Sequence, residues 1–137
     1  MECSGLNLYT LCVTKMVIPV YRFIAALLIT FSAFPALADE PVIEQVTVSR
    51  DGDLWTFDVT ISHPDSGWDH YADAWRILDE NGRSFGQRDL AHPHIEEQPF
   101  TRSLSGVTIP SEVRSVIIQA HDTVSGWSGA ARRVDLK

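Results

Sequence analysis

Residues 54–61 read Leu-Trp-Thr-Phe-Asp-Val-Thr-Ile, and apolar side chains occupy every second position after the first. One face of this stretch carries Trp55, Phe57, Val59 and Ile61, and polar side chains form the other face. An alternation with a period of two is typical of a strand that is buried on one face. The Asp51-Gly52 pair just before it favours a hairpin turn from an earlier strand at 42–48. The stretch therefore predicts antiparallel β-structure.

Similar short segments recur along the chain at spacings of roughly 8–12 residues. We expect strands at 42–48, 54–61, 69–78, 83–90, 100–107, 113–122 and 131–136. Asn81-Gly82 marks a second hairpin turn. About seven short strands and no helical window predict an all-β fold, an antiparallel β-sandwich of the immunoglobulin-like or fibronectin type III-like kind. A small Greek-key barrel is the alternative.

The first 38 residues differ from the rest in composition. Arg22 precedes an apolar run at 23–31, and Ala36-Leu37-Ala38 follows it. This order is typical of a secretory signal peptide, and the run is shorter than the ~20 residues that span a bilayer. We expect residues 1–38 to be removed and residues 39–137 to form one periplasmic or secreted domain, with an uncleaved anchor as the alternative. Translation from Met16 instead of Met1 would give a more ordinary signal.

Cysteine and charge limit the function of the expected mature domain. Cys3 and Cys12 both precede the cleavage site, so residues 39–137 carry no disulfide, no thiolate ligand and no lipid-bearing cysteine. They contain nine basic and 17 acidic residues, a formal charge of −8. This balance argues against nucleic acid and anionic membrane surfaces as partners, because both attract clustered lysine and arginine. It is compatible with binding of cations.

The histidines form the most informative pattern of the chain. If consecutive strands are antiparallel, the connection after the second expected strand, the connection after the fourth and the end of the sixth strand meet at one end of the sandwich. That end collects His63, His70, His92, His94 and His121. It also collects Trp68, Trp127, Asp65, Asp69, Glu96, Glu97 and Asp122. The topology thus predicts a histidine-rich end.

Neutral imidazole is a common ligand of transition metals, so this end is a candidate metal site. The leading ligands are His70, His92, His94 and His121, with His63 and Glu97 in reserve. A donor set without thiolate favours Cu(II), Zn(II) or Ni(II). The alternative is that these histidines donate hydrogen bonds that fix the loops.

The alternation also predicts side-chain directions on the third and sixth strands. Tyr71, Trp75 and Ile77 would point inward, which leaves His70 facing outward beside His121 on the neighbouring strand. Asp73 would then point inward and need a buried partner such as Arg76, Arg88 or a backbone amide.

Two other functions remain open from the sequence. Trp68 and Trp127 lie beside glycines and could be exposed anchors of a protein- or glycan-binding module, or lids over the sandwich end. An enzyme is the weakest hypothesis, because the chain has no Gly-x-Ser-x-Gly elbow, phosphate loop or dinucleotide motif. We therefore expect no enzymatic activity.

Three short stretches carry a resemblance to other proteins. They are Trp-Asp-His-Tyr-Ala-Asp at 68–73, His-Pro-His at 92–94 and Glu-Gln-Pro-Phe-Thr-Arg-Ser at 97–103. Together they resemble a group of small exported bacterial proteins of unknown function with an immunoglobulin- or fibronectin-like sandwich. The resemblance covers most of residues 39–137 and implies export, but no activity.

Overall fold

The computed structural model describes residues 39–137. The expected signal peptide and cleavage site, residues 1–38, lie outside the described residues. Eight strands form two antiparallel sheets, and residues 39–137 contain no helix. Accordingly, the described segments include no helix of the length and hydropathy that a membrane crossing requires. The predicted all-β architecture is confirmed.

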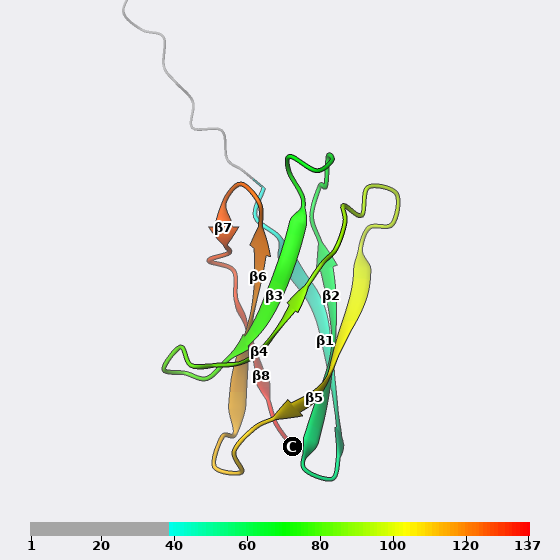
Figure 1. The fold of residues 1–137 in the computed structure, drawn as a ribbon. Coiled ribbons are helices and arrows are strands. Elements are labelled where there is room, and N and C mark those ends of the chain that lie inside the picture. Colours follow the sequence, from blue (N-terminus) through cyan, green and yellow to red (C-terminus); the bar gives the residue numbers. More distant parts are fainter. Residues whose placement is uncertain (1–38) are drawn as a thin grey trace, which may run out of the picture. The chain divides into compact units, whose positions relative to one another are not determined.

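The first sheet has three strands in the order β1-β2-β5. They span β1 (Val42–Asp51), β2 (Leu54–Ser62) and β5 (Phe100–Thr108). The second sheet has the order β4-β3-β6-β7, and β8 also pairs with β6. Its strands are β3 (Ala72–Leu78), β4 (Ser84–Asp89), β6 (Ser115–Asp122), β7 (Gly126–Trp127) and β8 (Arg132–Asp135). Figure 1 shows the two sheets facing each other with their strands running lengthwise.

The core lies between the sheets and follows the alternation of the sequence. On β2, buried and part-exposed residues alternate along the strand, and the side chains of Phe57, Val59 and Ile61 are fully buried. Trp75 of β3 and Ile118 of β6 meet them from the second sheet in the same hydrophobic cluster. Each of these large side chains contributes roughly 1.5–3 kcal/mol through burial.

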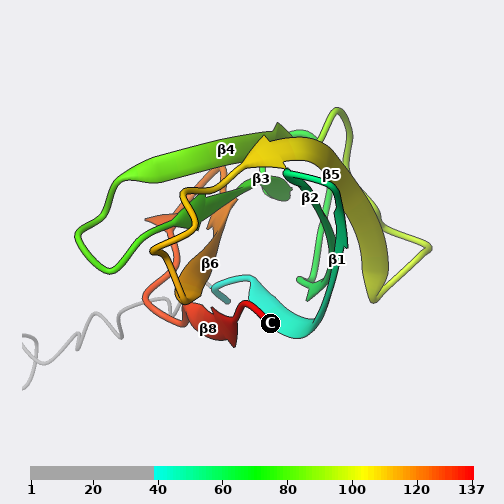
Figure 2. The same ribbon diagram turned by 90° about the horizontal axis from the view of Figure 1, so that it is seen from below.

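The two sheets approach each other along one edge, where β4 runs beside β5 (Figure 2). Gly86 of β4 lies at this approach, and a Cβ added there would come 3.1 Å from Cδ2 of Leu104. A glycine therefore lets the edges of the two sheets close together. Near the other edge, Arg132 of β8 donates hydrogen bonds to the carbonyl oxygens of Ile43 and Glu44 in β1.

The start of β3 departs from the predicted alternation. The pairing of β3 with β6 shifts register between Ala72 and Ala74, which places an extra residue, Asp73, at a β-bulge. Ala72, Ala74 and Trp75 are buried, whereas the Asp73 side chain is 29% exposed. The prediction that Asp73 points inward was wrong, because the bulge changes the face of every residue before it.

Candidate metal centre

The connection from β2 to β3 folds back on itself and brings two histidines together. The N–H of Ser66 donates to the carbonyl oxygen of His70 at 3.0 Å, and the N–H of His70 donates to that of Gly67 at 3.2 Å. Gly67 has φ 145°, a conformation that favours glycine. His63 stands at the start of this reversal, and its ring centroid lies 4.8 Å from that of His70. The predicted His70 position on a strand was wrong, because β3 begins only at Ala72.

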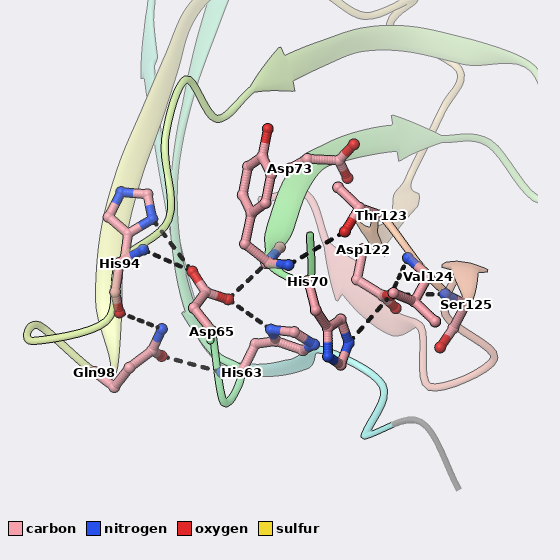
Figure 3. Close-up of polar contacts among 12 residues, drawn as sticks. His63, Asp65, His70, Asp73, His94, Gln98, Asp122, Thr123, Val124 and Ser125 are labelled. Carbon is pink, nitrogen blue, oxygen red and sulfur yellow. Dashed lines mark hydrogen bonds and ion pairs between the residues drawn. The ribbon is translucent and has the colours of Figure 1, made fainter. Parts of the chain in front are cut away.

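Asp65 is the centre of the hydrogen bonds at this end of the sandwich (Figure 3). Its Oδ1 accepts from Nδ1 of His63 at 2.6 Å and from the N–H of Ala72 at 2.9 Å. Its Oδ2 accepts from the N–H of His94 at 2.7 Å. The Asp65 side chain is fully buried. One carboxylate therefore ties the β2–β3 connection, the start of β3 and the β4–β5 connection together.

The bond between Asp65 and His63 selects the tautomer of the histidine ring. A carboxylate can only accept hydrogen bonds, so the shared hydrogen belongs to Nδ1 of His63. In the neutral imidazole, Nε2 of His63 then keeps its lone pair. This is the arrangement in which a carboxylate orients a metal-binding histidine from behind.

Asp122 approaches from the end of β6. Its Oδ1 accepts hydrogen bonds from the N–H groups of Val124 and Ser125 at 2.8 and 2.7 Å, which fixes the turn from β6 to β7. The next residue, Thr123, is bonded to Tyr71, since each donates its N–H to the other. These contacts hold the carboxylate beside His70, whose Nε2 lies 3.6 Å from Oδ1 of Asp122 (Figure 3).

Three metal-binding atoms converge at this point from three parts of the chain. His63, His70 and Asp122 each offer one ligand atom, and these atoms lie within 4.8 Å of one another. Nε2 of His63, Nε2 of His70 and Oδ2 of Asp122 are buried without a hydrogen-bond partner among residues 39–137. Buried polar atoms normally have a hydrogen-bond partner, so three buried atoms without one at this end of the sandwich need a physical explanation. Two imidazole nitrogens and one carboxylate oxygen are a donor set that divalent transition metals accept.

A second group lies in the connection from β4 to β5. His92, His94 and Glu97 offer ligand atoms that also lie within 4.8 Å of one another. The His94 ring is 1% exposed and stacks on Phe100 at a centroid distance of 3.7 Å. Burial, with the charges of Arg102 and His92, lowers the pKa of His94 below the usual 6.5. Its imidazole is therefore neutral at pH 7, the form that binds metals.

His121 lies apart from both groups. Its Nδ1 is 2.5 Å from Oδ1 of Asp73, and its ring packs edge-on against Trp127 at 4.8 Å. Ala74, not His70, is its partner across the strands, so the predicted pairing of His70 with His121 was wrong. The same contact gives Asp73 its partner, in place of the arginines or the backbone amide that we expected. No group of the described residues unites His70, His92, His94 and His121.

The two candidate anchor tryptophans have different surroundings. Trp68 is 69% exposed and packs its ring against Tyr71 at 5.8 Å. Trp127 is half-buried on β7, and the guanidinium of Arg76 lies 3.8 Å from its ring centroid. The Trp68 ring is thus exposed to solvent, whereas the Trp127 ring packs on the second sheet and is partly covered by Arg76.

Two carboxylates at this end matter more than the sequence indicated. Asp65 and Asp122 were expected only as acidic neighbours and His63 only as a reserve ligand, yet all three make buried polar contacts here. A signal was available for Asp122, because it directly follows His121 at the end of an alternating strand. Nothing in the local pattern indicated that Asp65 would face inward.

Fold and site together define a small all-β sandwich with a candidate metal centre at one end. No protein-family model matches the chain. The chain is 35% identical over 99 residues to a protein of Halomicrobium mukohataei named "Putative lipoprotein". This match covers 72% of the present chain and 48% of the relative, so the chain spans about half the relative's length.

Two solved structures have similar backbones at low sequence identity. One is a hypothetical protein from Pyrococcus horikoshii OT3, with 18% identity, a TM-score of 0.48 and coverage of 72% of this chain and 88% of that one. The other is a superoxide reductase in the oxidized state, with 15% identity, a TM-score of 0.46 and coverage of 72% and 90%.

Proposed function

We propose that this protein is an exported β-sandwich that binds one divalent transition-metal ion through His63, His70 and Asp122. Two observations carry the proposal: one ligand atom from each of the three residues lies within 4.8 Å of the others, and each of the three side chains has a buried nitrogen or oxygen without a hydrogen-bond partner among residues 39–137. The role is binding, and we assign no reaction to the site.

The energetics of burial support a cation at this point. Leaving one buried polar group unsatisfied costs about 1–3 kcal/mol, and more for a charged group. Three such groups side by side would cost several times that amount. A metal ion would satisfy all of them at once, because it accepts the lone pairs of both imidazoles and pairs with the carboxylate of Asp122. A buried water molecule, which makes up to about four hydrogen bonds, is the competing occupant that metal titration distinguishes.

The surroundings of the ligands also suit a metal. Asp65 binds Nδ1 of His63 and leaves Nε2 for another partner, and the two amides at Oδ1 of Asp122 leave Oδ2 for a further partner. Two imidazoles and a carboxylate suit both Zn(II) and Cu(II), and Cu(II) is expected to bind more tightly at equilibrium. Three protein ligands leave a coordination position for water or a small ligand.

Export and fold type are further parts of the proposal. The signal-like order of Arg22, the apolar run and Ala36-Leu37-Ala38 supports export, and so does the similarity to a protein named as a lipoprotein. Residues 39–137 would then be the mature domain. The adjacency of β3 and β6 in one sheet supports an immunoglobulin-like sandwich of the fibronectin type III kind.

Calorimetric titration tests the metal site. The protein is expressed from the full chain without a histidine tag, stripped with a chelator, and titrated with Zn(II) and then Cu(II) at pH 7.5. We expect the protein to bind one equivalent of metal tightly, and we expect the double variant His63→Ala/His70→Ala to lose this tight equivalent. The matched control is His121→Gln, which removes a histidine at the same end and leaves the tight equivalent in place.

Two further measurements distinguish loss of the metal ligands from misfolding of the double variant. Circular dichroism checks its sheet content, and the electron paramagnetic resonance spectrum of the Cu(II) protein reports how many nitrogens bind the metal. The proposal predicts two imidazole nitrogens in the tight site. A tight equivalent that survives in the folded double variant would overturn it, as would the absence of any tight binding in the wild type.

A further inference from the structure

We infer that the protein has a second, weaker metal site formed by His92, His94 and Glu97, and that both sites rest on the same carboxylate, Asp65. The second site lies in the connection from β4 to β5 and uses none of the ligands of the first. Its existence is independent of the proposed function, whereas the shared role of Asp65 rests on it.

His94 is the fixed point of this second site. Its ring is stacked on Phe100, its N–H donates to Asp65, and its carbonyl oxygen accepts from Nε2 of Gln98 at 2.9 Å. Gln98 in turn accepts from the N–H of His63 through Oε1 at 3.0 Å (Figure 3). Both ring nitrogens of His94 are buried without a hydrogen-bond partner in the described part of the chain. A rigid imidazole with unused nitrogens is a preorganised ligand.

The other two ligands reach His94 from the surface. Nε2 of His94 lies 3.8 Å from Oε1 of Glu97, and the His92 ring lies 4.6 Å from the His94 ring with a tilt of 34°. Pro93 separates the two histidines and restricts the backbone between them. A metal ion at Nε2 of His94 would need only small movements of the exposed His92 and Glu97 side chains to complete its ligands.

Asp65 connects the two sites through its two oxygens. Oδ1 holds Nδ1 of His63, and Oδ2 lies 3.8 Å from Nδ1 of His94. The carboxylate thus binds the ring of His63, which makes that imidazole a better ligand and fixes its orientation. It holds His94 through the backbone N–H, which accounts for the position of this residue beside His63.

The second site should bind more weakly than the first for two reasons. His92 and Glu97 are exposed, so their side chains lose conformational freedom when they bind. Glu97 is also paired with Arg102, whose guanidinium lies 2.9 Å from Oε1. Metal binding competes with this ion pair for the Glu97 carboxylate, and the positive charge of Arg102 repels the incoming cation.

Stoichiometry tests the inference. The tag-free protein is titrated with Zn(II) at pH 7.5, and we expect two equivalents of unequal affinity. The double variant His92→Ala/Glu97→Gln should lose the weak equivalent and keep the tight one. The double variant His63→Ala/His70→Ala should do the reverse, so failure of either site is seen separately from failure of the other.

Arg102→Met supplies a test that mere damage to the fold could not imitate. Removing the competing guanidinium should strengthen the weak equivalent about tenfold and leave the tight one unchanged. A single equivalent in the wild type would overturn the inference. So would a weak equivalent that persists in folded His92→Ala/Glu97→Gln, or one that Arg102→Met leaves unchanged or weakens.

Discussion

Oδ1 of Asp65 accepts a hydrogen bond from Nδ1 of His63 at 2.6 Å, and neither side chain is exposed to solvent. The two residues are separated by one proline, so their contact closes a short turn at the end of β2. Because the carboxylate binds Nδ1, the opposite nitrogen of His63 is free on the side of the ring that faces His70 (Figure 3). The bond thus links the local turn to the proposed chemistry of the site.

Replacing this carboxylate by an amide should weaken metal binding without removing a ligand. Asp65→Asn keeps the size of the side chain but offers only one accepting oxygen, so it cannot hold both histidines as Asp65 does. Loss of such a supporting carboxylate costs about 10–100-fold in metal affinity. Calorimetry should show this loss for the tight Zn(II) equivalent and a parallel loss for the weak one. Unchanged affinity of the tight site would contradict the role of Asp65.

Two substitutions separate the role of Asp122 as a proposed metal ligand from its role as the hydrogen-bond acceptor that fixes the β6–β7 turn. Asp122→Asn keeps an oxygen that can accept from Val124 and Ser125, so the β6–β7 turn should remain, while affinity for the tight metal falls about tenfold or more. Asp122→Ala removes the acceptor as well and should destabilise the metal-free fold by about 1–3 kcal/mol. Urea unfolding with a chelator measures stability, and calorimetry measures affinity. Equal stability of both variants would argue against the turn-fixing role.

Acid should destabilise the metal-free protein partly through His94. Its pKa is lowered in the fold, mainly by burial, so below pH 6.5 the unfolded chain takes up a proton that the folded chain refuses. Stability is therefore retained above pH 6.5 and lost below it, by at most about 1.4 kcal/mol per pH unit for one group. His94→Phe keeps the stack on Phe100 and should show a shallower loss between pH 7 and pH 5 in urea unfolding. An identical slope in the variant would contradict this effect.

The contact between His121 and Asp73 should not affect the binding of metal at either proposed site. Each side chain is more than a quarter exposed, and their contact lies outside both groups of ligands. His121→Gln and Asp73→Asn should therefore keep the stoichiometry and both affinities within about twofold. The surface contact itself contributes at most about 1 kcal/mol to stability. A tenfold loss of the tight equivalent in either variant would restore His121 as a ligand.

Much of the architecture could be predicted because strand patterns are local. The alternation at 54–61 becomes β2 with the predicted face buried, and the Asn81-Gly82 turn joins β3 to β4 as expected. The short strand β7 was not foreseen, since no strand was expected between residues 122 and 131. Its two residues pair with His121 and Asp122 because the Asp122 carboxylate folds the turn back.

The sequence predicted where the candidate site lies but not which residues contact one another in it. Antiparallel order alone carries the β2–β3 and β4–β5 connections and the end of β6 to one end of the sandwich, drawn uppermost in Figure 1. Asp65 contacts His63 and His94 there. The choice of partners followed from contacts between distant segments. The bulge at Asp73 turned that carboxylate toward His121, and the Thr123–Tyr71 bonds brought Asp122 to His70.

The sequence by itself determined seven of the strands, their order along the chain, the buried face of β2 and the histidine-rich end, because side-chain alternation and turn chemistry act between near neighbours. Only the tertiary structure decided which carboxylate meets which histidine. A shift of one residue in register reverses the direction of a side chain, and no local pattern at 72–74 revealed that shift. Ligand geometry at the ångström scale therefore depends on packing between the sheets.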